Sequence, residues 1–358
     1  MISVSHFLSD DNIERTIMVE SEIKRGRIPK WDNVKGVLIL LVVIGHMVEE
    51  NVGQSTACKA IFLFIYSFHM PLFIFCSGYF YSDKRIKEKV FFYLCVGILL
   101  LIMTFAERVF ICGRSGGLDF VNVDGAAWYM FAMAAWVLIT YGLRGQQTVL
   151  ILGFSLLLGC FSGYDSDIGD FLVLSRIIVY YPFYLTGHIA RDSERFPDFI
   201  GLHGREYSGR NLVKITISAA VVIIWAAICV RWLPTVYQLR PFFTGRNPFS
   251  GIYAESPLGL GVRVLCYMIT FAICISLMIF IPERKLPIIT KMGGAVVGNI
   301  FLAYTDQVFP DKTGSVGFPL FPSSWMGRSH NIELCARVYS VNGSFQQTFT
   351  VASENDLC

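Results

Sequence analysis

Three residues near the start of the sequence, Asp32, Lys35 and His46, have types that suit acid–base chemistry and a spacing that suits one helix face. Lys35 and His46 are 11 residues apart. Eleven residues of an α-helix turn through about 1100°, which is about 20° past three full turns, and rise about 16 Å. Lys35 and His46 therefore share a face, with Asp32 on the same side. Because histidine exchanges protons near neutral pH, His46 is a candidate general base.

These polar residues stand in an otherwise apolar run, WDNVKGVLILLVVIGHMVEEN (31–51). Burying an ionisable group in a membrane costs free energy, so such a group is by default a hypothesis about function. Two structural alternatives stay open. Lys35 could extend its ammonium group to the lipid headgroups, and His46 could lie at the far membrane surface. Gly36 and Gly45 allow another helix or a ligand to approach closely.

Two further polar residues lie in later apolar runs. His69 stands within FLFIYSFHMPLFIFCSGYF (62–80), and short antiparallel helices could bring it close to His46. Alternatively His69 makes a simple hydrogen bond to a neighbour, since Pro71 frees a backbone carbonyl nearby. Arg176 could hold an anionic coenzyme or a developing oxyanion, or could pair with an acidic residue.

The composition indicates the elements that must position these residues. Hydrophobic residues make up 54% of the 358-residue chain and charged residues 16%, whereas soluble domains carry about a quarter charged residues. We therefore predict an all-α integral membrane protein, a polytopic bundle of about nine spanning helices. The net charge of +3 is too small to indicate a nucleic-acid partner. The predicted spans are 34–50, 60–81, 90–108, 126–143, 148–162, 171–190, 212–233, 259–281 and 293–309, with a kink at Pro71 in the second.

Basic residues gather in alternate loops, which predicts a cytoplasmic N-terminus under the positive-inside rule. Residues 1–30 would form a cytoplasmic arm and residues 31–309 a membrane domain, whose first span would act as an uncleaved signal anchor. Residues 310–358 would form a polar tail without a span. Lys84 and Arg85, in the loop after the second span, either anchor this topology or add to an anion-binding rim. The interpretation that they are anchors is favoured.

Four motifs resemble those of the membrane acyltransferase 3 superfamily, specifically its fucose 4-O-acetylase-like branch. WDNVKGVLILLVVIGH (31–46) resembles the first-helix signature, a basic residue followed after ten residues by histidine, and FHMPLFIFCSGYF (68–80) resembles the second-span motif. AAWYMFAMAAW (126–136) and SRIIVYYPFYLTG (175–187) resemble weaker motifs of the fourth and sixth spans. The resemblance runs from about Trp31 to Phe309. Beyond that point the chain departs from the family, which has about ten spans.

The resemblance implies transfer of an acyl group, usually acetyl, from cytoplasmic acyl-coenzyme A to a sugar hydroxyl of an exported glycan or its lipid-linked precursor. His46 takes the place of the catalytic histidine and Lys35 that of the basic residue before it. His69 and Arg176 match the second histidine and the sixth-span arginine. Lys35 would orient the acyl donor or position Asp32. The acyl donor, acetyl-coenzyme A, would be a substrate, and the protein would lie in the plasma or inner membrane.

Two other function classes stay open. A proton-coupled secondary transporter of a glycan or small metabolite could use His46 and His69 as proton relays, although no internal repeat supports this. A non-catalytic component of surface-polymer assembly would suit the polar tail. The ten cysteines contain no CxxC pair, and no metal is predicted. The acceptor sugar, the acyl chain and the oligomeric state are not encoded in any motif of the sequence.

Overall fold

The computed structural model describes residues 28–49, 51–106, 109, 123, 125–165, 167–169, 171–201 and 209–294. All of them belong to one compact unit, residues 1–296, and the second unit, 297–358, lies outside the described residues. The predicted tail, 310–358, and nearly all of the predicted arm, 1–30, therefore have no described structure. The first described helix begins at Pro29, two residues before the predicted start of the membrane domain.

The described part of the chain is helical and contains no β-strand. The long helices are α2 (Pro29–Glu49), α5 (Ile86–Ala106), α6 (Ala127–Gly142), α7 (Thr148–Phe161), α8 (Leu174–Asp192), α10 (Gly209–Arg231) and α13 (Leu258–Phe280). The shorter ones are α3 (Thr56–Tyr66), α4 (His69–Tyr79), η2 (Ser162–Tyr164), α9 (Arg195–Phe199), α11 (Leu233–Val236), η3 (Tyr237–Leu239), α12 (Arg240–Phe243), η4 (Gly251–Tyr253) and α14 (Pro287–Gly294).

Eight of the nine predicted spans coincide with these helices, and the ninth, 293–309, extends beyond the described residues. By length and apolar composition, five described helices could cross a membrane: α2, the stretch Thr56–Tyr79, α5, Leu212–Arg231 and α13. The apolar helices of α6 and of Thr148–Tyr164 are shorter. The prediction of an all-α polytopic membrane protein is therefore confirmed.

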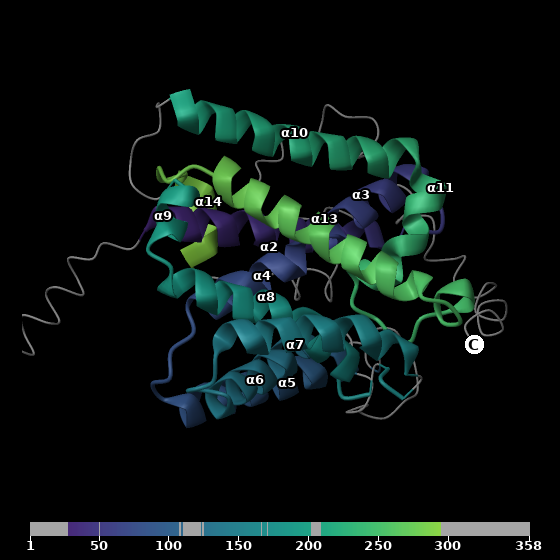
Figure 1. Ribbon diagram of the computed structural model, residues 1–358, viewed down its shortest axis with the longest axis horizontal. Helices are drawn as coiled ribbons and strands as arrows, with labels where there is room; N and C mark the ends of the chain where they lie inside the picture. Colours follow the sequence, from purple (N-terminus) through teal and green to yellow (C-terminus); the bar gives the residue numbers. More distant parts are fainter. Residues whose placement is uncertain are drawn as a thin grey trace, which may run out of the picture. The chain divides into compact units, whose positions relative to one another are not determined.

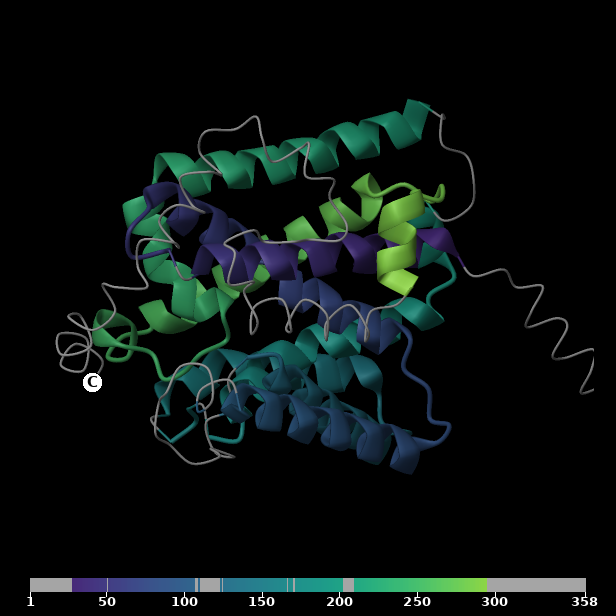
Figure 2. The same cartoon turned by 180° about the vertical axis from the view of Figure 1, so that it is seen from behind.

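Figures 1 and 2 show α10 on one side of the described unit and the α5–α6 pair on the other, with α2, α4, α8 and α13 between them. The buried apolar residues form two clusters. One joins α2 and α3 to α10 and α13, and the other joins α6 and α7 to α8. Helix α4 contributes to both clusters and packs most extensively against α8.

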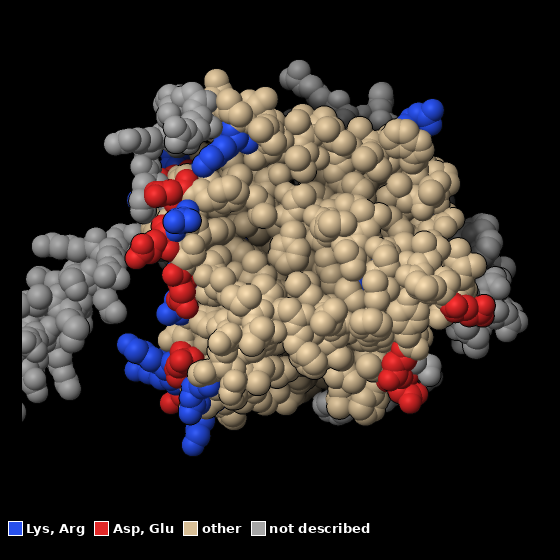
Figure 3. Space-filling view, viewed as in Figure 1, with Lys and Arg blue, Asp and Glu red and all other residues tan. Residues whose placement is uncertain are grey.

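An apolar surface separates the charged residues at the two ends of the described unit. In Figure 3, lysine, arginine and acidic residues gather along one edge and a few lie at the other, with an uncharged surface between them. Many large apolar side chains of the described unit are exposed, for example Phe91 at 70% and Val149 at 71%. A surface that exposes so much apolar area suits contact with lipid rather than water.

The second predicted span is interrupted, as the sequence predicts, but the break lies just before Pro71. Helix α3 ends at Tyr66 and α4 begins at His69. Pro71 is thus in the first turn of α4, where its missing N–H and fixed φ are tolerated. A continuous helix would need that N–H to bond the carbonyl of Ser67, four residues earlier.

Side chains from other helices satisfy the backbone at this break. The hydroxyl of Thr270 donates to the carbonyl of Ser67 (2.8 Å), and the Cys274 thiol lies 3.8 Å from the carbonyl of Phe68. The indole N–H of Trp225 donates to the Ser67 hydroxyl (2.9 Å). Because no water is available inside a bilayer, the donors from α13 make the break tolerable, and the bond from Trp225 ties α10 to the same point.

Helix α8 contains Pro182, and two carbonyls one turn before this proline accept side-chain hydrogen bonds from other helices. The indole of Trp136 donates to the carbonyl of Ile177 (2.9 Å), and the Tyr267 hydroxyl donates to that of Val179 (2.7 Å). These bonds connect α8 to α6 and α13 around its proline.

Two glycines let α4 and α8 approach each other until their backbones are in contact. A Cβ atom on Gly78 would collide with the carbonyl oxygen of Tyr184, and one on Gly187 would collide with that of Phe75. Small residues at helix crossings allow this packing in membranes. It holds α4, which begins with His69, firmly against α8.

Candidate active site

The carboxylate of Glu49 connects His46 to a tyrosine of the next helix. His46 Nδ1 lies 3.3 Å from Glu49 Oε2, and the Tyr66 hydroxyl donates to the same oxygen at 2.7 Å. The side chains of His46 and Glu49 are 38% and 43% exposed, so this end of α2 is open to a reactant. His46 and Glu49 are three residues apart, so the α-helix itself places them side by side.

The same contact fixes the protonation pattern of the His46 ring. An ionised carboxylate can only accept hydrogen bonds, so Nδ1 of neutral His46 carries the proton and Nε2 carries the free electron pair. In active sites, the hydrogen bond that one ring nitrogen of a histidine makes commonly determines which nitrogen carries the proton. His46 therefore presents Nε2 as a base.

His69 lies beside this group and has the same tautomer. Its Nδ1 is 2.8 Å from the carbonyl oxygen of Ile65, which can only accept, so Nε2 of the neutral ring is again unprotonated. The ring meets that of Tyr66 edge-on, with centroids 4.8 Å apart. The two predicted histidines are thus in one neighbourhood, with Tyr66 and Glu49 between them.

An arginine from a later segment completes this end. Arg240, the first residue of α12, places its guanidinium 5.4 Å from the ring centroid of Phe62, which stacks on Tyr66 at 3.8 Å. The charge of Arg240 acts on Glu49 and on Tyr66. We call His46, Glu49, Tyr66, His69 and Arg240 the His46 cluster.

Lys35 and Asp32 form an ion pair at the other end of α2. Lys35 Nζ lies 3.1 Å from Asp32 Oδ1, with side-chain exposures of 23% and 5%. The ammonium also lies 5.5 Å from the ring centroid of Phe80. Lys35 therefore lies against the Asp32 carboxylate, as the predicted role of positioning Asp32 requires. Every residue from Gly36 to Gly45 is apolar, so α2 carries its polar groups at its two ends.

The two neighbours of Asp32 have structural contacts. Asn33 is fully buried and donates to the carbonyls of Pro282 (2.9 Å) and Arg284 (2.8 Å), while the Thr290 hydroxyl donates to Asn33 Oδ1 (2.5 Å). Trp31 packs on the ring of Tyr79 with centroids 4.2 Å apart. The Trp-Asp-Asn triplet thus fastens α2 to α4 and to the segment around α14.

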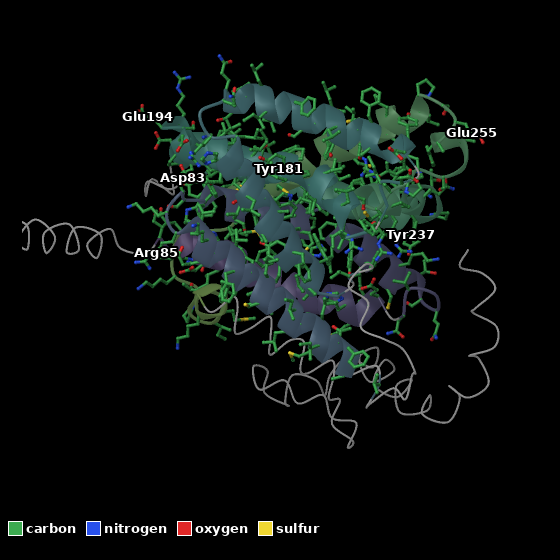
Figure 4. All side chains as sticks on the ribbon, turned by 90° about the horizontal axis from the view of Figure 1, so that it is seen from below. Asp83, Arg85, Tyr181, Glu194, Tyr237 and Glu255 are labelled. Atoms are coloured by element: carbon green, nitrogen blue, oxygen red, sulfur yellow. The ribbon has the colours of Figure 1, made fainter. Side chains whose placement is uncertain are left out.

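The residues predicted to bind the acyl donor divide between the two ends. Lys84 and Arg85 are exposed in the segment that follows α4, so they lie at the Lys35 end. In Figure 4, Arg85 lies with Asp83 and Glu194 at one end, and Tyr237 and Glu255 lie at the other.

Arg176, the fourth residue in the predicted donor set, belongs to the His46 end. It is buried, with its guanidinium 5.2 Å from the ring centroid of Trp128, whose ring packs on Tyr180. The Tyr180 hydroxyl donates to the carbonyl of Phe243 (2.7 Å), in the short helix that Arg240 begins. The structure therefore separates Arg176 from Lys35, Lys84 and Arg85.

Three members of the His46 cluster, Glu49, Tyr66 and Arg240, are absent from the sequence prediction. Glu49 had a signal, because a carboxylate three residues after a candidate base lies on the same helix face. Tyr66 stands three residues before His69 but in a different helix, and Arg240 comes from a segment about 190 residues after Glu49. Among the described residues, no group of three or more histidine, cysteine or acidic side chains could hold a metal ion.

Comparison with known proteins gives one family match and two partial relatives. The family model described as an acyltransferase domain, that of the acyltransferase 3 family, matches residues 28–298. Nodulation protein NolL of Sinorhizobium fredii (strain NBRC 101917 / NGR234) is 34% identical over 129 residues, which are 31% of this chain and 35% of that protein. NolL of Mesorhizobium japonicum (strain LMG 29417 / CECT 9101 / MAFF 303099) is 46% identical over 62 residues, 16% of this chain and 17% of that protein.

The matched stretches thus span 35% and 17% of the relatives' own length. No solved structure matches the chain. The family match covers most of the predicted membrane domain, 31–309, and confirms the predicted superfamily. The fucose 4-O-acetylase-like branch stays a prediction.

Proposed function

Because the chain belongs to the acyltransferase 3 family, we propose that it is a membrane O-acyltransferase whose catalytic base is His46. The observation that carries the proposal is the hydrogen bond between His46 Nδ1 and Glu49, which leaves Nε2 as a base at a partly exposed position. The proposed donor is acyl-coenzyme A, with acetyl as the group, and the proposed acceptor is a sugar hydroxyl of a cell-surface or exported glycan.

The proposed reaction has one base and one leaving group. His46 Nε2 takes the proton from the sugar hydroxyl as its oxygen attacks the thioester carbon. The carbon–sulfur bond then breaks, and the thiolate receives that proton from the imidazolium, giving an ester and the free thiol of the coenzyme. A positioned general base typically accelerates such a step by about 10²–10⁴-fold.

The other members of the His46 cluster have supporting roles in this mechanism. Glu49 holds the ring in the tautomer that exposes Nε2 and balances the positive charge that forms on it. Tyr66 holds the carboxylate in place. Arg176 and Arg240 lie at the same end, which favours the oxyanion role for Arg176 over the donor-phosphate role.

The donor would enter from the Lys35 end. We propose that this end lies on the cytoplasmic side of the plasma or inner membrane. Lys84 and Arg85 are exposed there and suit the coenzyme's phosphates, whereas Lys35 is already paired with Asp32. Along α2 the thioester would have to reach His46 across about 16 Å. Acyl-coenzyme A is long enough to suit this division of polar residues, with its phosphates at the Lys35 end and its thioester at the His46 end.

The interruption between α3 and α4 is the one feature of the described structure that would also suit a transporter. Transporters use the free carbonyls of broken helices to coordinate ions. Here donors from Thr270 and Cys274 occupy the carbonyls of Ser67 and Phe68, which favours a structural break.

Mass spectrometry of surface glycans tests the proposed function. Cells that make this chain should carry glycans with an ester-linked acetyl group that cells without it lack, and re-expression should restore it. Glycans that change in amount but carry no acyl group in either strain would instead indicate a transporter or an assembly component.

A further inference from the structure

A small apolar cavity lies away from the His46 cluster, among α4, α8, α9 and α13. Its volume is about 280 Å³. Its walls include five phenylalanine rings: Phe75, Phe183, Phe196, Phe199 and Phe271. The cavity is near the Lys35 end, because the ring of Phe196 packs on Tyr79 and that of Tyr79 packs on Trp31.

The lining selects for hydrocarbon. Thr186, one of its few polar side chains, already donates its hydroxyl proton to the carbonyl of Pro182 (2.7 Å). Water needs two to four polar partners to be held in a cavity, and this lining does not offer them. Pockets for drug-sized ligands measure about 300–1,000 Å³, so the cavity suits one chain rather than a whole coenzyme.

The edge of the cavity lies where the apolar surface meets the charged end of the protein. Phe199 lines the cavity and is 44% exposed, so this wall reaches the surface. The ammonium of Lys214 lies 5.3 Å from the ring centroid of Phe199. Glu194 and Arg195, at the start of the same short helix, are exposed, and Figure 3 shows charged side chains gathered along this edge.

We propose that this cavity binds one acyl chain of an anionic phospholipid whose phosphate lies against Lys214. A hydrocarbon chain below a cationic side chain at the membrane boundary matches the two parts of such a lipid. The chain would fill the space among α4, α8, α9 and α13 and support the helix that begins with His69. The site is separate from the acyl-transfer site, so the proposal does not depend on the proposed function.

Native mass spectrometry of the purified full chain tests the proposal, with phosphatidylglycerol, phosphatidylcholine or palmitoyl-coenzyme A added as probes. The wild type should retain one phosphatidylglycerol molecule in preference to phosphatidylcholine. Ala190→Phe fills the cavity from α8 and should abolish this retention. Its control, Ala220→Phe, adds the same ring to an exposed position of α10 and should leave retention unchanged.

Lys214→Gln leaves the cavity intact and provides a second variant that does not disturb packing. Near an anionic group one lysine is worth about 1 kcal/mol, so this variant should reduce the preference for phosphatidylglycerol about fivefold. Equal retention by wild type and Ala190→Phe would overturn the proposed site. An unchanged headgroup preference in Lys214→Gln would overturn the role of Lys214, and retention of palmitoyl-coenzyme A in place of phospholipid would assign the cavity to an acyl donor.

Discussion

Replacing Glu49 by glutamine should impair acyl transfer for two reasons. The neutral amide no longer balances the positive charge that forms on His46. Because it carries N–H donors as well as an oxygen acceptor, it also no longer selects the tautomer with the proton on Nδ1. The carboxylate accepts one bond from His46 Nδ1 and one from the Tyr66 hydroxyl. Loss of a buried orienting carboxylate in a serine-protease triad lowers turnover by about 10⁴-fold. Here the contact is 3.3 Å long and the pair is partly exposed, so we expect a smaller fall in kcat, about 10–100-fold, with little change in KM.

The assay is transfer of a labelled acetyl group from acetyl-coenzyme A by purified protein, in the wild type, Glu49→Gln, Glu49→Asp and Glu194→Gln. Glu194 is exposed at the opposite end and serves as the matched control, and Glu49→Asp should recover part of the rate. A double variant isolates the mechanism. In a His46→Ala background, Glu49→Gln should cost nothing further, because residues that act as one unit are not additive. A further tenfold loss there would refute the idea that Glu49 acts through His46.

Three other predictions follow from individual contacts. Tyr66→Phe removes the second bond to Glu49 and should lower kcat about 3–10-fold, since one hydrogen bond to a charged group is worth about 1.5 kcal/mol or less in this setting; an unchanged kcat would contradict that role. Asn33→Ala removes three buried hydrogen bonds and should destabilise the fold by about 2–3 kcal/mol, measured as a lower midpoint of thermal unfolding. A midpoint equal to that of the wild type would contradict the role of Asn33 in holding α2 against the segment around α14. Gly187→Leu should abolish the yield of folded protein in detergent, because its Cβ would collide with the carbonyl of Phe75. The control Gly153→Leu adds a side chain to open space and should fold normally. Equal yields of the two variants would contradict the close crossing of α4 and α8.

The helices and the proximity of Lys35 to Asp32 can be predicted from the sequence, because both depend on local rules. Apolar length identifies a span, and three-residue spacing places two side chains on one face. The position of the break before Pro71 follows from the missing proline N–H. What makes that break tolerable, donors from Thr270 and Cys274, comes from a helix about 200 residues away in sequence, and no local pattern encodes it.

The candidate site was only partly predictable for the same reason. His46 and His69 were identified as a possible pair, but the group that lies between them, Tyr66 with Glu49, depends on how α3 packs on α2. The sequence assigns Arg176 to the donor set, because a motif does not state which end of the bundle a residue occupies. Contacts through Trp128 and Tyr180 place it at the His46 end.

The most direct test of the central claim compares wild type, His46→Ala and His188→Ala in proteoliposomes supplied with labelled acetyl-coenzyme A and a glycan acceptor. His188 is the matched control because it contacts Tyr81 in the segment after α4, at the Lys35 end. We predict ester-linked label with the wild type and His188→Ala, and at least about 100-fold less with correctly inserted His46→Ala. Wild-type transfer by His46→Ala would contradict the assignment of His46 as the base, and solute movement without ester formation would contradict the proposed acyltransferase function.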